Sequence, residues 1–281
     1  MAITAAMVKE LREMTGAGMM DCKKALVEVE GDLEKAVDWL RQKGMSKAAK
    51  KSGRATSEGL VRVARSAEAV AMSALLCETD FVARGEQFIA MADKVAATVL
   101  EQAPVDAEAL QGLVGEDLTQ LIASVGENMT LGQFVRVPVA ANTFVGQYIH
   151  ANNKIGVLVT VECGSADAAA KPEVAELAKN VAMQVAATNP MALDESSLDA
   201  AAVEREREVY RQKALDEGKP AQIVERIADG AVKKFCKEVC LLDQPYIRDD
   251  KKSIADVVRE AGKACGETLK IAAYTRIQLG A

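Results

Sequence analysis

The chain has 281 residues, 49% of them hydrophobic and 27% charged, which is the balance of a globular protein with room for two domains. Its formal net charge of −6 at pH 7 argues against general nucleic-acid binding, and we expect no direct contact with nucleic acid. The sequence contains no apolar run of about 18 residues and no basic-then-apolar leader. We therefore expect neither a membrane-spanning nor a secreted protein, and we expect it in the cytoplasm.

Residues 1–43 have the apolar spacing of three short helices, separated by glycine turns at 16–18 and 31–32. So small a bundle resembles the ubiquitin-associated fold and typically serves as a docking module. Met19 and Met20 begin the second helix, where adjacent side chains cannot share one face. One of them could point outward as a deformable contact residue, with core filling as an equally weighted alternative.

Residues 41–54 carry six basic residues and no acidic one. This composition is typical of a solvated linker or of a frayed extension of the preceding helix. A nucleic-acid contact would need an interleaved aromatic side chain for base stacking, and the segment has none. The sequence therefore predicts an N-terminal helical docking domain with its linker at residues 1–55.

A first core subdomain is predicted at residues 56–140, where the apolar period changes to that of strands. Its expected elements are strands at 59–65 and 69–76, a helix to about 102, a helix that ends at Gly126, and an extended segment at 129–139.

The corner at residues 77–84 joins the second of these strands to the helix after it. Thr79 and Asp80 are residue types that cap a helix by accepting hydrogen bonds from its first backbone N–H groups. Phe81 then falls in the first turn, where it can either pack into the core as a staple or project toward a partner. From the corner alone, core packing is the commoner outcome for such a side chain.

The second core subdomain, residues 141–281, repeats this plan. Strands at 143–150 and 155–162 lead through a cysteine and a corner to an amphipathic helix, which indicates an internal duplication. The second corner reads Gly164-Ser165-Ala166-Asp167 and lacks the Asp-Phe pair. A corner can thus be built without the aromatic ring, and this contrast favours a role for Phe81 outside the fold.

Two charged helices joined by Gly218-Lys219-Pro220 predict a helical hairpin at residues 198–238. A helix at 253–265 and a strand at 269–279 complete the chain. The predicted fold class is therefore α+β, with a three-helix ubiquitin-associated-like bundle followed by a duplicated α+β core with antiparallel sheets and a helical hairpin insertion.

Motifs that carry chemistry are scarce, with no glycine-rich phosphate loop and no nucleophile elbow. Cys236 and Cys240 could supply half of a metal site, but the single histidine, His150, has no obvious companion ligand. The acid pair Asp249-Asp250 is predicted to lie in a loop without a pocket that would raise a pKa. We therefore expect reduced thiols, no metal or other cofactor, no catalytic residue, and no chemical step performed by the chain.

Two long motifs resemble signatures of one family, bacterial elongation factor Ts. Residues 11–26, which read Leu-Arg-Glu-Met-Thr-Gly-Ala-Gly-Met-Met-Asp-Cys-Lys-Lys-Ala-Leu, resemble its N-terminal signature. Thr79-Asp80-Phe81-Val82 resembles its second signature. Shorter similar stretches extend the resemblance over nearly the whole chain, at 47–51, 126–128, 155–159, 218–220 and 244–246.

The resemblance implies a guanine-nucleotide exchange factor that binds the translational GTPase elongation factor Tu in its GDP-bound and nucleotide-free forms. The exchange factor would disturb the Mg²⁺ and phosphate site of the GTPase, so that GDP leaves and GTP can bind. The resemblance assigns Mg²⁺ dislocation to four residues, with the aromatic ring as a wedge: Thr79, Asp80, Phe81 and Val82. It assigns contact with the GTPase to Arg12, Met19, Met20 and His150.

The sequence stops at Ala281, so we expect the longer helical C-terminal module of some family members, and its contacts, to be missing. Two other functions stay open. A non-catalytic adaptor would use the N-terminal bundle on another target and would keep Phe81 buried. A small-molecule enzyme would need a deep polar pocket with perturbed titratable groups.

Overall fold

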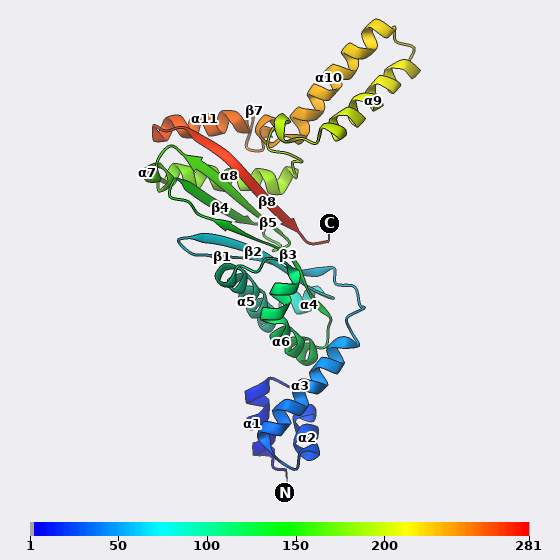
Figure 1. Cartoon of the computed structure of the whole chain (residues 1–281), viewed down its shortest axis with the longest axis vertical. Helices are drawn as coiled ribbons and strands as arrows, with labels where there is room; N and C mark the ends of the chain where they lie inside the picture. Colours follow the sequence, from blue (N-terminus) through cyan, green and yellow to red (C-terminus); the bar gives the residue numbers. More distant parts are fainter. Residues whose placement is uncertain (1–2, 281) are drawn as a thin grey trace. The chain divides into compact units, whose positions relative to one another are not determined.

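The computed structural model describes residues 3–280 as a mixture of α-helices and small sheets with antiparallel strand pairs (Figure 1), which is the expected α+β class. Backbone contacts divide the chain into two compact units. The first contains the chain up to Val137, Ala151–Lys154 and the residues from Ile277, and the second contains Pro138–His150 and Ile155–Arg276. The finer division at 1–55, 56–140 and 141–281 stays a prediction.

The first unit begins with three helices that pack around a small apolar core. Their bounds are α1 (Ala5–Thr15), α2 (Met19–Glu28) and α3 (Leu33–Ala49). The Thr4 side chain caps α1 by accepting a hydrogen bond from the Met7 N–H at 3.3 Å, and Gly16 ends α1 in the left-handed conformation at φ 66°. The buried core residues are Val8, Leu11, Cys22, Ala25, Leu26 and Ala36.

Helix α3 is longer than the sequence predicts, because it continues to Ala49 through most of the expected linker. Its buried Gly44 lets it approach helix α6 (Ala107–Val125) closely, since a Cβ at this glycine would lie 3.4 Å from the Cβ of Ala123. Packing against α6 therefore stabilises residues that the composition alone suggested were solvated. Of the two alternatives left open for this segment, the helix extension is correct for residues 41–49 and the solvated linker is wrong there.

A sheet with covering helices follows in the first unit. Its elements are β1 (Glu58–Arg65), β2 (Ala69–Cys77), α4 (Asp80–Ala83), α5 (Glu86–Gln102), α6 and β3 (Met129–Pro138). The strand order is β1-β2-β3, with β1 and β2 as the predicted antiparallel hairpin, and α5 packs on both strands (Figure 1). The predicted apolar face of α5 lies in the core, with buried side chains at Phe88, Ala92, Val95 and Val99.

The second unit repeats this order of elements. Its elements are β4 (Thr143–Ile149), β5 (Ile155–Cys163), α7 (Ala166–Ala169), α8 (Pro172–Thr188) and, later in the chain, β8 (Leu269–Gln278). The strand order is β4-β5-β8, β4 and β5 pair in antiparallel fashion, and α8 packs on both. Each unit therefore has a strand hairpin, a one-turn helix, a long helix, and a third strand beside the second.

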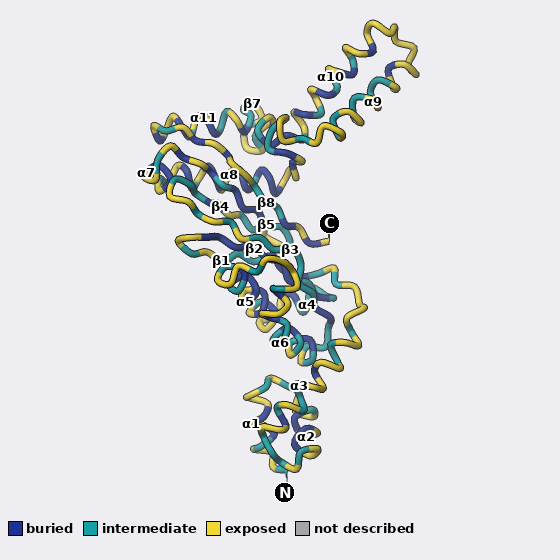
Figure 2. The backbone as a smooth tube through the Cα atoms, in the orientation of Figure 1, coloured by how far each residue is buried: buried dark blue, intermediate teal, exposed yellow. Residues whose placement is uncertain are grey.

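Helices α9 (Ala200–Asp216) and α10 (Ala221–Val239) form the predicted hairpin, and Figure 2 shows that much of its surface is exposed. The short helices η1 (Glu195–Ser197) and η2 (Leu241–Asp243) flank it. Arg211 of α9 pairs with Glu225 of α10 at 2.8 Å. The buried apolar residues of the hairpin are Ala214, Val224, Ala228, Val232 and Cys236.

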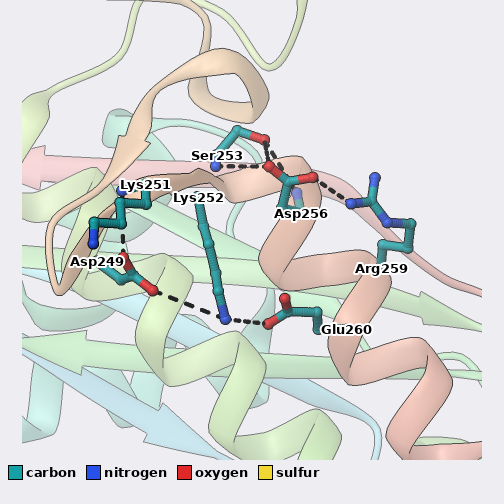
Figure 3. A network of polar contacts seen from close by, with 7 residues as sticks. All are labelled: Asp249, Lys251, Lys252, Ser253, Asp256, Arg259 and Glu260. Carbon is teal, nitrogen blue, oxygen red and sulfur yellow. Dashed lines mark hydrogen bonds and ion pairs between the residues drawn. The ribbon is translucent and has the colours of Figure 1, made fainter.

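A two-stranded ribbon and a helix complete the second unit, with bounds β6 (Pro245–Tyr246), β7 (Asp249–Ser253) and α11 (Ile254–Cys265). The acid pair that begins at Asp249 therefore lies in a strand, and the loop prediction is wrong. Figure 3 shows Lys252 between the carboxylates of Asp249, at 3.9 Å, and Glu260, at 2.7 Å. Ser253 and Asp256 form a capping box on α11, and the Ser253 hydrogen bonds hold the pKa of Asp256 below its usual range.

All six cysteines are buried and none forms a disulfide: Cys22, Cys77, Cys163, Cys236, Cys240 and Cys265. Burial raises the pKa of Cys77 to about 12 and that of Cys240 to about 11. A thiol with a raised folded-state pKa leaves stability unaffected below the unfolded-state pKa of about 8.5, and stability falls as the pH rises from there toward 12.

These thiols are expected to resist a thiol-specific aromatic disulfide reagent at pH 8 in the folded protein. For Cys77, the thiolate fraction should be about a thousandfold lower than in the unfolded chain, and burial also blocks access. Absorbance of the released thiolate measures the reaction, with a denatured sample as the control in which all six cysteines react. Rapid labelling of Cys77 in the folded protein would show that the core beneath the corner opens.

Candidate functional site

The corner between β2 and α5 is built by a helix cap. β2 ends at Cys77, and Thr79 has an extended backbone at φ −127° and ψ 155°. The Thr79 hydroxyl accepts a hydrogen bond from the Val82 N–H at 3.4 Å, which starts the one-turn helix α4. Gly85 then precedes α5 as its N-cap residue. The predicted cap at Thr79 is confirmed, although the structure divides the expected single helix into α4 and α5.

The four-residue helix α4 has an apolar inner side and an exposed aromatic ring. Ala83 is buried and the half-buried Val82 packs against the core of the first unit. Phe81 is 85% exposed, so it does not act as a core staple. Asp80 pairs with Arg84 one turn later, at 2.9 Å. The corner therefore presents an aromatic ring beside a half-exposed carboxylate.

Glu127 holds the cap from the far end of α6. Its carboxylate accepts two hydrogen bonds from Thr79, one from the backbone N–H at 3.0 Å and one from the hydroxyl at 2.6 Å. The left-handed Gly126, at φ 92°, ends α6 and turns the chain so that Glu127 faces the corner. No role was predicted for Glu127 beyond its place in the family-like stretch at 126–128.

Further contacts join the corner to the segment after α6, and here the carboxylate belongs to the corner. The Glu78 carboxylate accepts a hydrogen bond from the Asn128 N–H at 2.6 Å and lies 3.4 Å from the Arg54 guanidinium. The buried Asn128 side chain donates to the backbone oxygens of Arg54 at 2.8 Å and Ser52 at 3.4 Å. The segment that follows α3 is thereby attached to the corner.

The corner of the second unit has the same type of helix cap but a different residue at the position of Phe81. Ser165 caps α7 and donates from its hydroxyl to the Glu267 carboxylate at 2.8 Å. The left-handed Gly266 precedes this glutamate, as Gly126 precedes Glu127. The position that corresponds to Phe81 holds the exposed Asp167. The duplication was the signal in the sequence that could have identified Glu127.

The other predicted contact residues lie on different elements. Arg12 on α1, and Met19 and Met20 at the start of α2, are exposed on the N-terminal bundle. Both methionines point outward, with 45% and 66% of their surfaces exposed, so core filling is wrong for each. His150 lies in the second unit after β4, and its Nδ1 is 3.1 Å from the Tyr148 hydroxyl.

Cavities of the first unit offer no obvious catalytic centre. A cavity of about 490 Å³ lies among α2, α3 and α6. Charged groups in its lining pair with one another, Lys47 with Asp21 at 2.8 Å and Arg41 with Glu116 at 2.6 Å. Within residues 3–280, no group of three or more His, Cys, Asp or Glu side chains could hold a metal ion. No helix in that range is long and apolar enough to cross a membrane.

The sequence was compared with known families and curated proteins. The profile of the family described as Elongation factor TS matches residues 78–281, a range that includes the corner. The chain is 74% identical to Elongation factor Ts of Desulfovibrio desulfuricans, with 100% of this chain and 99% of the relative covered. It is 55% identical to the protein of the same name from Nitratidesulfovibrio vulgaris, with 100% and 96% covered. Identity to the Lawsonia intracellularis protein is 49%, with 100% and 99% covered. The chain belongs to the Elongation factor TS family.

Proposed function

We propose that the protein is a guanine-nucleotide exchange factor for the translational GTPase elongation factor Tu. It binds the GDP-bound and nucleotide-free forms of the GTPase in the cytoplasm and performs no chemical step of its own. It takes no cofactor, and it needs neither a membrane nor nucleic acid to act.

The physical basis is the way in which a GTPase holds its nucleotide. Mg²⁺ and the groups around the β-phosphate of GDP form one electrostatic site, so a displacement of either weakens both. A partner that is accommodated only when this site is deformed lowers the affinity for GDP. By linkage, the nucleotide lowers the affinity for the partner by the same factor. GTP can then enter and expel the exchange factor.

The observation that carries this proposal is the 85% exposure of Phe81 on a capped and braced turn. An aromatic side chain that is buried in a partner commonly contributes about 2 kcal/mol or more to the interaction. In the proposed mechanism Phe81 is the wedge that displaces elements supporting Mg²⁺, and Asp80 competes for polar groups near them. Thr79 fixes the turn and Val82 anchors it to the core.

The remaining contact residues provide further contacts with the GTPase. The N-terminal bundle, which we propose to be ubiquitin-associated-like, docks through Arg12, Met19 and Met20. Exposed methionines suit such a surface because their side chains adapt to the partner. His150 lies on the proposed contact rim of the second core subdomain. The domains in this proposal are residues 1–55, 56–140 and 141–281, with the hairpin at 198–238.

Release of a fluorescent GDP analogue from purified elongation factor Tu tests the proposal. The protein is expected to raise the release rate by about 5- to 150-fold, since the coupling free energy between two ligands is typically about 1–3 kcal/mol. Excess unlabelled GDP prevents rebinding, and bovine serum albumin serves as the control. An unchanged rate in the presence of well-folded protein would reject the exchange function.

That negative outcome would favour the adaptor function, in which the bundle binds another target. The adaptor reading, however, requires a buried Phe81, and the ring is exposed. The exchange function is therefore the better supported of the two.

A further inference from the structure

We infer that Glu127 is a positioning residue, whose carboxylate fixes the direction in which α4 presents Phe81. This inference rests on the proposed exchange function and deepens it. Glu127 does not itself have to touch the GTPase, because both of its carboxylate oxygens already accept hydrogen bonds from Thr79, at 3.0 and 2.6 Å.

Helix α4 cannot hold its own orientation. The helix comprises four residues, Asp80–Ala83, and so short a helix is not stable without external contacts. Its start is fixed by Thr79, and Thr79 is held in turn by Glu127 through its backbone and its side chain. Hydrogen bonds to a charged acceptor are the stronger kind, so the two hydrogen bonds from Thr79 to Glu127, called the brace below, resist rotation of the turn.

The hydrogen bonds from Thr79 to Glu127 have a counterpart in which the carboxylate belongs to the corner and the N–H group to the segment after α6. Glu127 accepts from the corner, whereas the corner residue Glu78 accepts from the Asn128 N–H at 2.6 Å. Each of the two carboxylates thus accepts a hydrogen bond from the backbone of the segment to which the other carboxylate belongs. We call this pair the crossed contacts. Crossed contacts of this kind oppose sliding as well as separation, which is what a rigid wedge requires.

The corner of the second unit has only part of this arrangement. Ser165 donates to Glu267 at 2.8 Å, as Thr79 does to Glu127. The residue that corresponds to Glu78 is Gly164, which has no side chain to form a crossed contact. The hydroxyl–glutamate bond is therefore common to both corners, while the crossed contact accompanies the corner that bears Phe81.

This comparison separates a purely structural role from a positioning role. If the cap–glutamate bond served the fold alone, its loss would have the same consequence in both units. If this bond also fixes the direction of Phe81, only its loss at Glu127 would change nucleotide release. The chain therefore supplies its own matched control, Glu267, on a corner whose tip has no aromatic ring.

The experiment compares Glu127→Ala with Glu267→Ala in the full chain. Each variant is titrated against elongation factor Tu loaded with a fluorescent GDP analogue, and the maximal release rate is separated from the concentration that gives half of it. Circular dichroism and urea unfolding verify folding and measure the lost stability. We expect both variants to lose stability, and Glu127→Ala to lose more, because it removes two hydrogen bonds from Thr79 whereas Glu267→Ala removes one from Ser165. We expect only Glu127→Ala to lower the maximal release rate, by about tenfold or more, because small misplacements of an acting group have large effects on rate.

A further variant keeps the test informative if Glu127→Ala fails to fold. Glu78→Ala removes the crossed contact with Asn128 and the ion pair with Arg54, and its counterpart Gly164 shows that a corner can fold without a side chain at this position. We expect Glu78→Ala to lower the maximal rate with little change in the half-saturating concentration.

The outcomes distinguish the inference from the function on which it rests. No acceleration by the wild-type chain would reject the exchange function itself. Acceleration that is lowered equally by Glu127→Ala and Glu267→Ala, with Glu78→Ala at the wild-type rate, would overturn the positioning role and leave the exchange function intact.

Discussion

Phe81→Ala is expected to lower the acceleration of GDP release about thirtyfold or more, which corresponds to the loss of about 2 kcal/mol from an aromatic anchor. The free energy of unfolding should change by less than about 0.5 kcal/mol, because the side chain is 85% exposed and its truncation removes little packing. Release of a fluorescent GDP analogue and urea unfolding measure the two quantities on the same preparation.

Val105→Ala is the matched control for this substitution. Val105 is another large apolar residue of the first unit, 89% exposed in the loop between α5 and α6. Its truncation also removes exposed apolar surface, but it should leave nucleotide release unchanged. Equal losses in the two variants would mean that general surface apolarity, and not the corner, drives the exchange. Full activity of Phe81→Ala would move the site away from the corner.

Elements with a clear apolar period were predictable from the sequence because local spacing decides which face is buried. The β1–β2 hairpin follows from its apolar, strand-like runs, and the apolar face of α5 follows from the helical spacing of its apolar residues; both are confirmed. The extension of α3 to Ala49 was not, since it depends on close packing of Gly44 against α6, a contact between distant parts of the sequence. The β6–β7 ribbon was also missed because its strands are short and polar.

The candidate site was predictable only in part, for a similar reason. The cap at Thr79 is local, and helix-capping rules identify it from neighbouring residues. The brace at Glu127 is not local, because 48 positions separate it from Thr79 along the chain. The residues of the corner alone do not decide whether the Phe81 side chain is buried or exposed. The contrast with the second corner favoured exposure, which is correct. The contact roles of Arg12 and His150 stay predictions.

Phe88 provides the internal comparison for Phe81, since the same side chain has the opposite environment. It lies in α5, is 1% exposed, and belongs to the core that also contains Cys77 and Ala83, on either side of the corner. Removal of a buried phenylalanine ring loses its transfer free energy and leaves a cavity that the surrounding residues fill only partly. The role of Phe88 is therefore expected to be support of the fold from beneath the corner.

Phe88→Ala is accordingly expected to lower the free energy of unfolding by about 3–5 kcal/mol, in contrast to the small change for Phe81→Ala. Urea unfolding followed by circular dichroism measures this loss, and Phe88→Leu, which keeps much of the volume, should lose clearly less. At a temperature where Phe88→Ala is still folded, its acceleration of GDP release should exceed that of Phe81→Ala. The opposite order would mean that exchange follows the stability of the core and not the exposed ring. The expected order would show that the exchange activity, which depends on Phe81, and the stability of the core, which depends on Phe88, are separable properties of this region.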